Sequence, residues 1–104
     1  MKRLVLLSLL LLNHFLVAGS EKISNDCTLK TKKLYGKIKI VESFPDLKVK
    51  IVDSFPDLKV KVVQSFPDSC GKWKFVESFP DLKIKFVDSF PDLKIKYVDS
   101  FPGL

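Results

Sequence analysis

The sequence predicts a small all-β domain built from six tandem strand-turn repeats, and three observations support this prediction. First, the eleven-residue phrase at residues 47–57 recurs six times, with small changes, between Gly36 and Gly103. Second, apolar residues alternate with lysines over residues 47–51, and a period of two is typical of a strand with one buried face. Third, every repeat contains Ser-Phe-Pro, and proline, which has no N–H to donate, ends strands and begins turns.

The first 20 residues have the three parts of a secretory signal peptide. Lys2 and Arg3 form a short basic start, residues 4–17 are almost entirely apolar, and residues 18–20 supply the small side chains that signal peptidase accepts. The alternative is a transmembrane anchor, but the apolar run is shorter than the roughly 20 residues that a spanning helix needs. We therefore expect a signal peptide at residues 1–20, an irregular lysine-rich N-terminal arm at residues 21–35 and the repeat domain at residues 36–104.

The composition of the chain after the leader excludes several kinds of chemistry. Residues 21–104 contain 16 Lys and 12 Asp plus Glu, but no Arg and no His. Without histidine, His–Cys zinc sites, histidine acid–base pairs and serine triads are unavailable. The sequence also has no phosphate loop, no nucleotide-binding fingerprint and no metal-spaced cluster. We therefore expect no enzymatic activity, no cofactor and no metal site.

Cys27 and Cys70 are the two cysteines of the chain. Two cysteines in an exported chain usually pair, so we expect a disulfide between them. Closing a loop of this length would stabilise the fold by about 4 kcal/mol in the chain-entropy model. Two free thiols or an intermolecular bridge are alternatives that the sequence leaves open. A redox role is not expected, because the spacing is not Cys-x-x-Cys.

The repeats divide into two halves of three. Successive Ser-Phe-Pro motifs are 11, 11, 13, 11 and 11 residues apart. The one longer interval contains the insertion Ser69-Cys70, and Gly71 then opens the second half as Gly36 opens the first. Because internal repetition is the strongest sequence evidence for architecture, we treat residues 36–68 and 71–103 as matching halves of one domain.

Two features within each repeat should shape its fold. Apolar residues fall together at Ile51 and Val52, where we expect a bulge or bend. A phenylalanine precedes each proline and is too large to be only a loop residue, so we expect these side chains to form an aromatic layer of the core. They are Phe44, Phe55, Phe66, Phe79, Phe90 and Phe101.

Two ordinary architectures are alternatives for such repeats. A β-solenoid needs at least two corners per repeat, whereas eleven residues hold one strong turn and one weaker bend. A meander needs only one turn per repeat, but it leaves two exposed edges that are prone to aggregation. Neither architecture explains why the repeats divide three plus three.

The tandem motif Lys-x-Lys-x-Val-Asp-Ser-Phe-Pro-Asp is interrupted midway by Gly-Lys-Trp-Lys-Phe-Val at residues 71–76. Over residues 35–104 this arrangement resembles the septoil-knot family of small exported bacterial proteins. The resemblance implies a closed all-β domain with a deep seven-crossing torus knot, whose chain circles a ring more than once, and a biochemical role that is unassigned. It also leads us to expect that repeats one to three pack against repeats four to six, with slow unfolding and protease resistance.

Pairs of lysines are the most visible candidate site. If the pairs shared a surface, they could bind anionic glycans, lipid headgroups or nucleic acid. The alternative is a solvated face whose charge prevents aggregation. We expect no specific nucleic-acid binding, because no arginine is present to bind phosphate bidentately. The candidate anion-binding residues are Lys37, Lys39, Lys48, Lys50, Lys59, Lys61, Lys72, Lys74, Lys83, Lys85, Lys94 and Lys96.

The acidic residues form two series whose oxygens could in principle bind Ca²⁺. Turn chemistry and pairing with lysine explain both series without a metal. The repeat serines have no base to activate them, and Trp73 is expected to fill space where the halves meet. The first series is Glu42, Asp53, Glu77, Asp88 and Asp99, with Gln64 in the third repeat, and the second is Asp46, Asp57, Asp68, Asp81 and Asp92.

The sequence supports two functional hypotheses. In the first, the chain is an exported, monomeric structural or interaction domain of unassigned role, in the periplasm or outside the cell, and its lysines are only solvated. In the second, it is a cationic module that weakly binds an anionic polymer or a membrane surface through the lysine pairs. Retention on heparin or on anionic vesicles across a salt series separates the two.

Overall fold

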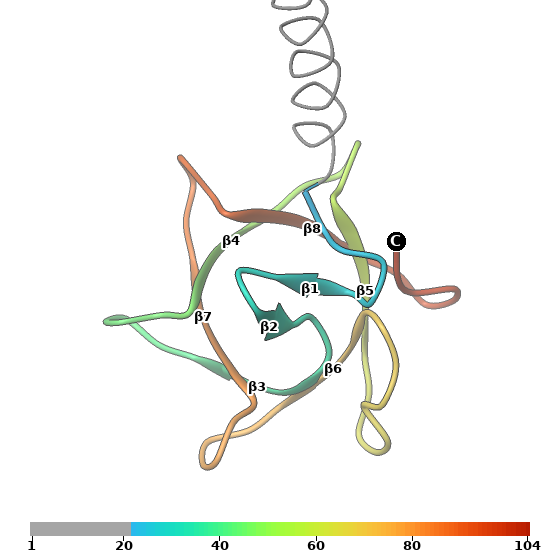
Figure 1. Ribbon diagram of the computed structural model, residues 1–104, viewed down its shortest axis with the longest axis horizontal. Helices are drawn as coiled ribbons and strands as arrows, with labels where there is room; N and C mark the ends of the chain where they lie inside the picture. Colours follow the sequence, from blue (N-terminus) through green and yellow to red (C-terminus); the bar gives the residue numbers. More distant parts are fainter. Residues whose placement is uncertain (1–21) are drawn as a thin grey trace, which may run out of the picture.

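The computed structural model describes residues 22–104, so the expected signal peptide lies outside the described residues. Here the chain is all-β, with a two-stranded antiparallel sheet followed by a closed barrel of parallel strands (Figure 1). None of the described residues forms a helix long and apolar enough to cross a membrane. The strands are β1 (Thr28–Leu29), β2 (Lys32–Lys33), β3 (Gly36–Ile40), β4 (Leu47–Ile51), β5 (Leu58–Val62), β6 (Lys72–Phe75), β7 (Leu82–Phe86) and β8 (Leu93–Tyr97).

Neighbouring strands of the barrel always come from opposite halves of the repeat domain. The order around the barrel is β3-β6-β5-β8-β4-β7. Strands β3, β4 and β5 therefore take alternate positions in a first circuit, and β6, β7 and β8 fill the positions between them in a second (Figure 1). The prediction that the first three repeats pack against the last three is confirmed. The solenoid and meander alternatives, in which sequence neighbours would pack together, are wrong.

Each barrel strand pairs with one neighbour along its beginning and with another along its end. Residues 36–38 of β3 pair with β6, and residues 38–40 pair with β7. In the same way β4 pairs with β7 and then β8, and β5 pairs with β8 and then β6. This stagger closes the sheet on itself, as a barrel requires.

Alternate residues of the strands fill the barrel. In β4, Leu47 and Val49 are buried and Lys48 between them is exposed, which confirms the predicted period of two. Beyond Ile51 the chain leaves the ladder at Val52, where a bulge or bend was expected. The buried strand residues are Ile38, Leu47, Val49, Leu58, Val60, Trp73, Leu82, Ile84, Leu93 and Ile95.

Six loops project outward from the barrel, and five of them straddle one strand of the opposite half (Figure 1). The loop between β3 and β4, for example, is tied to β7 at both ends, because Val41 N–H donates to the Ile84 carbonyl and Asp46 N–H to the Lys83 carbonyl. We call these segments the rim loops. They are residues 41–46 over β7, 52–57 over β8, 76–81 over β3, 87–92 over β4 and 98–103 over β5, together with residues 63–71, which lead from β5 into the adjacent β6.

The six phenylalanines lie in the rim loops and not in the core. They are 78–90% exposed, and their φ angles lie between 53° and 56°. The predicted aromatic layer is therefore wrong. The physical reason is space: a barrel of six strands is narrow, and aliphatic side chains and Trp73 already fill it.

The N-terminal arm covers the end of the barrel where the strands begin. Contrary to the expected irregular structure, β1 and β2 form an antiparallel pair. Three arm lysines form ion pairs with aspartates that directly precede barrel strands. The pairs are Lys22–Asp57 at 3.0 Å, Lys30–Asp92 at 2.8 Å and Lys32–Asp46 at 3.7 Å.

Candidate functional site

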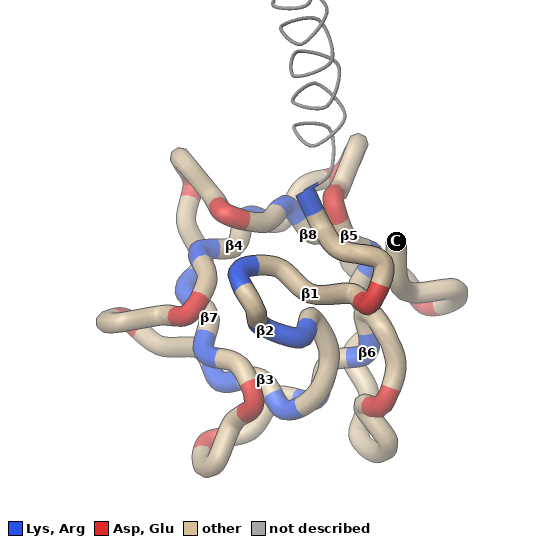
Figure 2. The backbone as a smooth tube through the Cα atoms, in the orientation of Figure 1, with Lys and Arg blue, Asp and Glu red and all other residues tan. Residues whose placement is uncertain are grey.

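The candidate lysines surround the barrel as a belt. Inward-facing positions of the strands are taken by the buried residues, so the lysines between them point outward. Their positions along the barrel strands are among the blue segments of Figure 2. Each lysine is the register partner of a lysine on the neighbouring parallel strand. The pairs are Lys37–Lys74, Lys39–Lys83, Lys48–Lys85, Lys50–Lys94, Lys59–Lys96 and Lys61–Lys72, and we call these residues the lysine belt.

The lysine belt brings like charges together on neighbouring strands. Like charges that face each other across neighbouring strands disfavour pairing. Within residues 22–104, every lysine of an ion pair belongs to the arm and none to the belt. The belt also circles the barrel, so its pairs do not lie on one flat face. An anion that bridged a pair would relieve the repulsion between its two ammonium groups.

The second acidic series joins the two halves of the domain. Four of its carboxylates accept a 2.8 Å hydrogen bond from the backbone N–H of a lysine in the opposite half. The pairs are Asp46 with Lys83, Asp57 with Lys94, Asp81 with Lys37 and Asp92 with Lys48. The carboxylates therefore stabilise strand starts, and among the described residues no three acidic or sulfur side chains lie together as a metal site.

Asp92 shows how strongly this position favours the ionised carboxylate. Burial disfavours its charge, but the Lys30 ammonium and the Lys48 N–H outweigh burial and hold the pKa of Asp92 below the usual 3.8. Both contacts are hydrogen bonds of 2.8 Å. The first acidic series differs, because its members are exposed in the rim loops and, within residues 22–104, make no ion pair.

Neighbouring rim loops enclose grooves whose floor is a pair of belt lysines. The clearest lies between loops 52–57 and 98–103 and has a volume of about 590 Å³. Lys59 and Lys96 contribute from the register pair of β5 and β8, and Phe55 and Phe101 contribute from the two loops. Asp53 of the first acidic series also lines this groove. Cationic, aromatic and carboxylate groups therefore meet in one place.

A second groove, beside loop 87–92, has the same composition. Its volume is about 580 Å³, and its lining includes the register pair Lys50 and Lys94, together with Phe90 and Asp88. Lys22 of the arm also contributes to it. The repeat thus places the same combination of side chains at more than one point of the rim.

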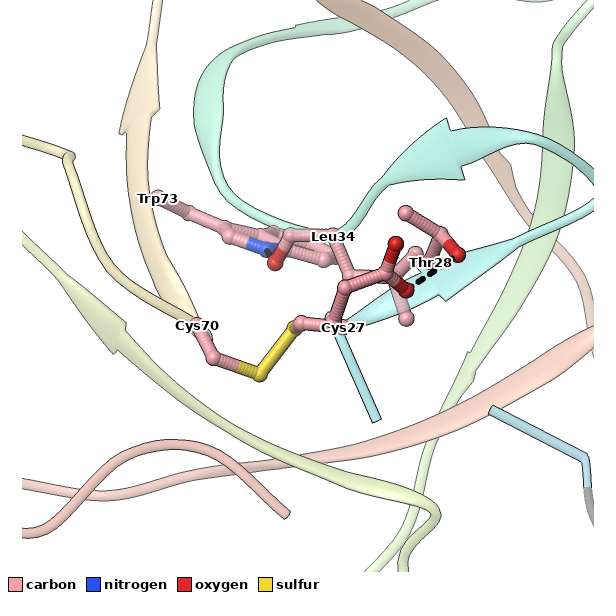
Figure 3. Close-up of a disulfide and its surroundings, with 6 residues drawn as sticks. Cys27, Thr28, Leu34, Cys70 and Trp73 are labelled. Carbon is pink, nitrogen blue, oxygen red and sulfur yellow. Dashed lines mark hydrogen bonds between the residues drawn. A yellow bond between two sulfur atoms is a disulfide. The ribbon is translucent and has the colours of Figure 1, made fainter. Parts of the chain in front are cut away.

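A disulfide joins the arm to the rim loop that precedes β6. Cys27 and Cys70 are bonded with their Cα atoms 5.8 Å apart, which confirms the expected pairing (Figure 3). Next to the bond, the Trp73 indole Nε1 donates to the Leu34 carbonyl at 3.0 Å. Trp73 is fully buried, so it fills space where the halves meet, as predicted.

A family model described as the 7(1) septoil knot domain matches residues 31–104. The chain belongs to the septoil knot domain family. The match begins just before β2, so the septoil knot domain includes part of the arm as well as the repeats. A search of curated proteins finds no match to the chain.

Sequence reasoning found the lysines of the septoil knot domain but not the grooves. It treated the lysines as one set and the phenylalanines as another, because they are several residues apart in every repeat. Only the parallel register brings Lys59 beside Lys96, and both line the same groove as Phe55 and Phe101. The regular repeat was the one sequence feature that could have predicted the grooves. Residues at the same position of each repeat lie at matching points around the barrel once the strands of the two halves alternate.

Proposed function

We propose that this septoil knot domain is an exported, non-catalytic interaction domain that presents aromatic rim loops on a rigid barrel. The supporting observation is the six phenylalanines, which are 78–90% exposed with φ near 55°. A left-handed conformation costs a residue with a side chain roughly 1–2 kcal/mol. An exposed Phe also forgoes the burial that would stabilise the fold. Stability does not account for six such residues, whereas contact with another molecule does.

The export part of the proposal rests on two features. Residues 1–20 have the composition of a signal peptide, and the Cys27–Cys70 disulfide is compatible with an oxidising compartment. The periplasm and the extracellular space both meet this condition. Expression with the natural leader, followed by fractionation and N-terminal sequencing, tests it, and recovery of uncleaved chain in the cytoplasm would contradict it.

We also infer that the barrel is deeply knotted. Family membership supports this, together with the two circuits of the chain and the rim loops that straddle strands of the other half. A knotted barrel would hold the rim loops at fixed positions, which reduces the entropy lost when they bind a partner.

A second candidate function is a cationic module for anionic glycans or lipid headgroups. The observation that favours it is the lysine belt, whose in-register ammonium groups form no ion pair within residues 22–104. Charge-assisted hydrogen bonds to a carboxylate, sulfate or phosphate group are the interactions that such a pair offers.

Two experiments on the mature chain, residues 21–104, test the two candidates. Replacing all six rim phenylalanines by glycine should leave the barrel folded and no less stable, because these side chains do not pack in the core. Loss of the fold would show that the phenylalanines serve folding, and would overturn the interaction proposal. For the cationic candidate, retention on heparin or anionic vesicles should decline as salt rises. No retention at low salt would eliminate that candidate.

A further inference from the structure

We propose that the groove between rim loops 52–57 and 98–103 binds an acidic saccharide unit, with its carboxylate or sulfate on Lys59 and Lys96. Equivalent grooves would let one molecule bind several segments of an acidic glycan. The inference rests on the cationic candidate described above and narrows its ligand class. It needs no covalent step.

The floor of the groove supplies two cationic donors. Lys59 of β5 and Lys96 of β8 are register partners on parallel strands, so their side chains leave the barrel on the same face. Both line the groove, both are exposed, and within residues 22–104 neither is in an ion pair. An acid group between them would receive charge-assisted hydrogen bonds from both and remove their mutual repulsion.

The rim of the groove supplies acceptors, and these distinguish a sugar from a phosphate. Asp53 lines the groove with the hydroxyls of Ser54 and Ser100. Sugar hydroxyls can donate hydrogen bonds to the Asp53 carboxylate while an acid group on the same chain accepts from the lysines. A phosphodiester group has no hydrogen-bond donor of its own, so Asp53 repels it, whereas every ring of an acidic saccharide carries hydroxyl donors beside its acid group. The mixture of charges therefore favours an acidic saccharide.

The walls of the groove suit a sugar ring. Phe55 and Phe101 line it from opposite loops and are 90% and 88% exposed. The face of an aromatic ring carries negative charge, which attracts the weakly positive C–H groups on the face of a pyranose. The volume of about 590 Å³ lies in the range of roughly 300–1,000 Å³ that small-ligand pockets occupy.

The placement of the grooves around the rim favours a polymer over a flat surface. The rim loops point outward in all directions of the ring, so one bilayer surface reaches only those on one side (Figure 1). A flexible glycan can pass from the groove at Lys59 and Lys96 to the one at Lys50 and Lys94. Binding at linked sites raises the overall affinity without any new contact.

The experiment is an NMR titration of the isotope-labelled mature chain with a sulfated heparin hexasaccharide and with a hexamer of galacturonic acid. A dextran hexamer is the neutral control. We expect the acidic oligomers to shift the amides of residues 53–55 and 98–101, with an affinity that decreases as salt rises. Lys59→Gln with Lys96→Gln should weaken binding at this groove by roughly tenfold or more. The matched variant, Lys37→Gln with Lys74→Gln, removes the same charge from the β3–β6 pair and should leave these shifts in place.

The possible results separate the inference from the proposed function. If phosphatidylglycerol vesicles or a single-stranded oligonucleotide bind and the acidic hexamers do not, the inference is wrong and the cationic candidate stands. If no anionic probe binds at low salt, both fail. Equal binding of dextran, or equal loss in the two lysine variants, would overturn the role given to Lys59 and Lys96. The double variant Phe55→Gly, Phe101→Gly should bind the acidic hexamers more weakly than the natural chain, while its thermal unfolding curve stays unchanged.

Discussion

Asp92 and Lys48 are joined by two reciprocal hydrogen bonds. The Asp92 carboxylate accepts from the Lys48 N–H, and the Lys48 carbonyl accepts from the Asp92 N–H, each at 2.8 Å. The two residues are 44 positions apart and belong to opposite halves of the repeat domain. The aspartate that follows Phe-Pro therefore does more than end a turn, because it joins the start of one strand to the loop that straddles it.

The first prediction concerns acid stability. The folded pKa of Asp92 is lower than its usual 3.8, because the bonds from Lys30 and Lys48 outweigh burial. The ionised form therefore stabilises the fold fully above the unfolded pKa, and this contribution is lost as pH falls through the folded pKa. Urea unfolding between pH 2 and pH 7 should show less loss of stability in acid for Asp92→Asn than for the natural chain. Asp88→Asn, at an exposed rim position, is the control, and an unchanged acid profile for Asp92→Asn would contradict the prediction.

The second prediction compares a large exposed side chain with a smaller buried one. Phe55 is 90% exposed at a φ of 55°, whereas Leu58, three residues later, is 1% exposed. Phe55→Gly should change the free energy of unfolding by no more than about 1 kcal/mol, since glycine adopts this φ freely. Leu58→Ala should cost about 2–5 kcal/mol. Chemical denaturation of both variants checks this. A larger loss of unfolding free energy for Phe55→Gly than for Leu58→Ala would contradict the prediction and support an aromatic core layer.

The third prediction concerns the disulfide. Replacing Cys27 and Cys70 together by serine should lower the free energy of unfolding by about 4 kcal/mol in the chain-entropy model for a separation of 43 residues. Hydrogen exchange should increase most in β1 and β2, because the barrel ladder does not depend on the bond. Equal loss of protection throughout the barrel would show that the arm is required for closure.

The fourth prediction separates two glycines at the junction of the halves. A Cβ at Gly71 would overlap the Lys59 carbonyl oxygen and the backbone of Gly103, whereas a Cβ at Gly103 meets its nearest atom, the Cys70 carbonyl oxygen, at 3.6 Å. Both glycines have positive φ, so both substitutions cause strain. Gly71→Ala should therefore be the more destabilising of the two in thermal unfolding. Equal thermal unfolding midpoints for the two variants would contradict this, because they would show that the strands around Gly71 move to admit a Cβ without loss of stability.

The fifth prediction concerns kinetics. Every barrel pairing joins opposite halves, and five of the six rim loops must leave the strand that they straddle before the chain can open. Unfolding should therefore be slow, and the barrel should resist proteases under native conditions. The Cys27→Ser, Cys70→Ser variant should remain resistant in the barrel, because the interleaved path does not need the bond. Rapid digestion of residues 36–104 in either form would refute the prediction.

Local patterns in the sequence predict the strands well and the loops poorly. Alternation of Leu47, Lys48 and Val49 predicts a strand because side-chain direction alternates in any strand, whatever its partners are. Phe55 was placed in the core because phenylalanine is usually buried, and nothing local signals a left-handed φ before a proline. Its exposure follows from the width of the barrel, which depends on all strands together.

The short loops that join successive parallel strands were the other feature that local sequence patterns could not predict. Parallel strands usually need a crossover of a dozen or more residues. Here residues 41–46 suffice between β3 and β4, because Ile84 of β7 is the register partner of both Ile40 and Leu47, so the chain does not have to return along the length of a strand. The insertion at Ser69 and Cys70 correctly marked the boundary between the halves, but not the alternation of their strands. The grooves follow from that alternation, so they too required the register.

The alternating order of the strands also fixes the size of the molecule. In an open repeat array, a further unit is added at one end and extends the binding surface. In this barrel, each repeat of one half occupies a gap left by the other half, so deletion of a single repeat would leave two strands of the same half side by side. A single repeat can therefore be neither added nor removed without breaking the alternation that closes the barrel.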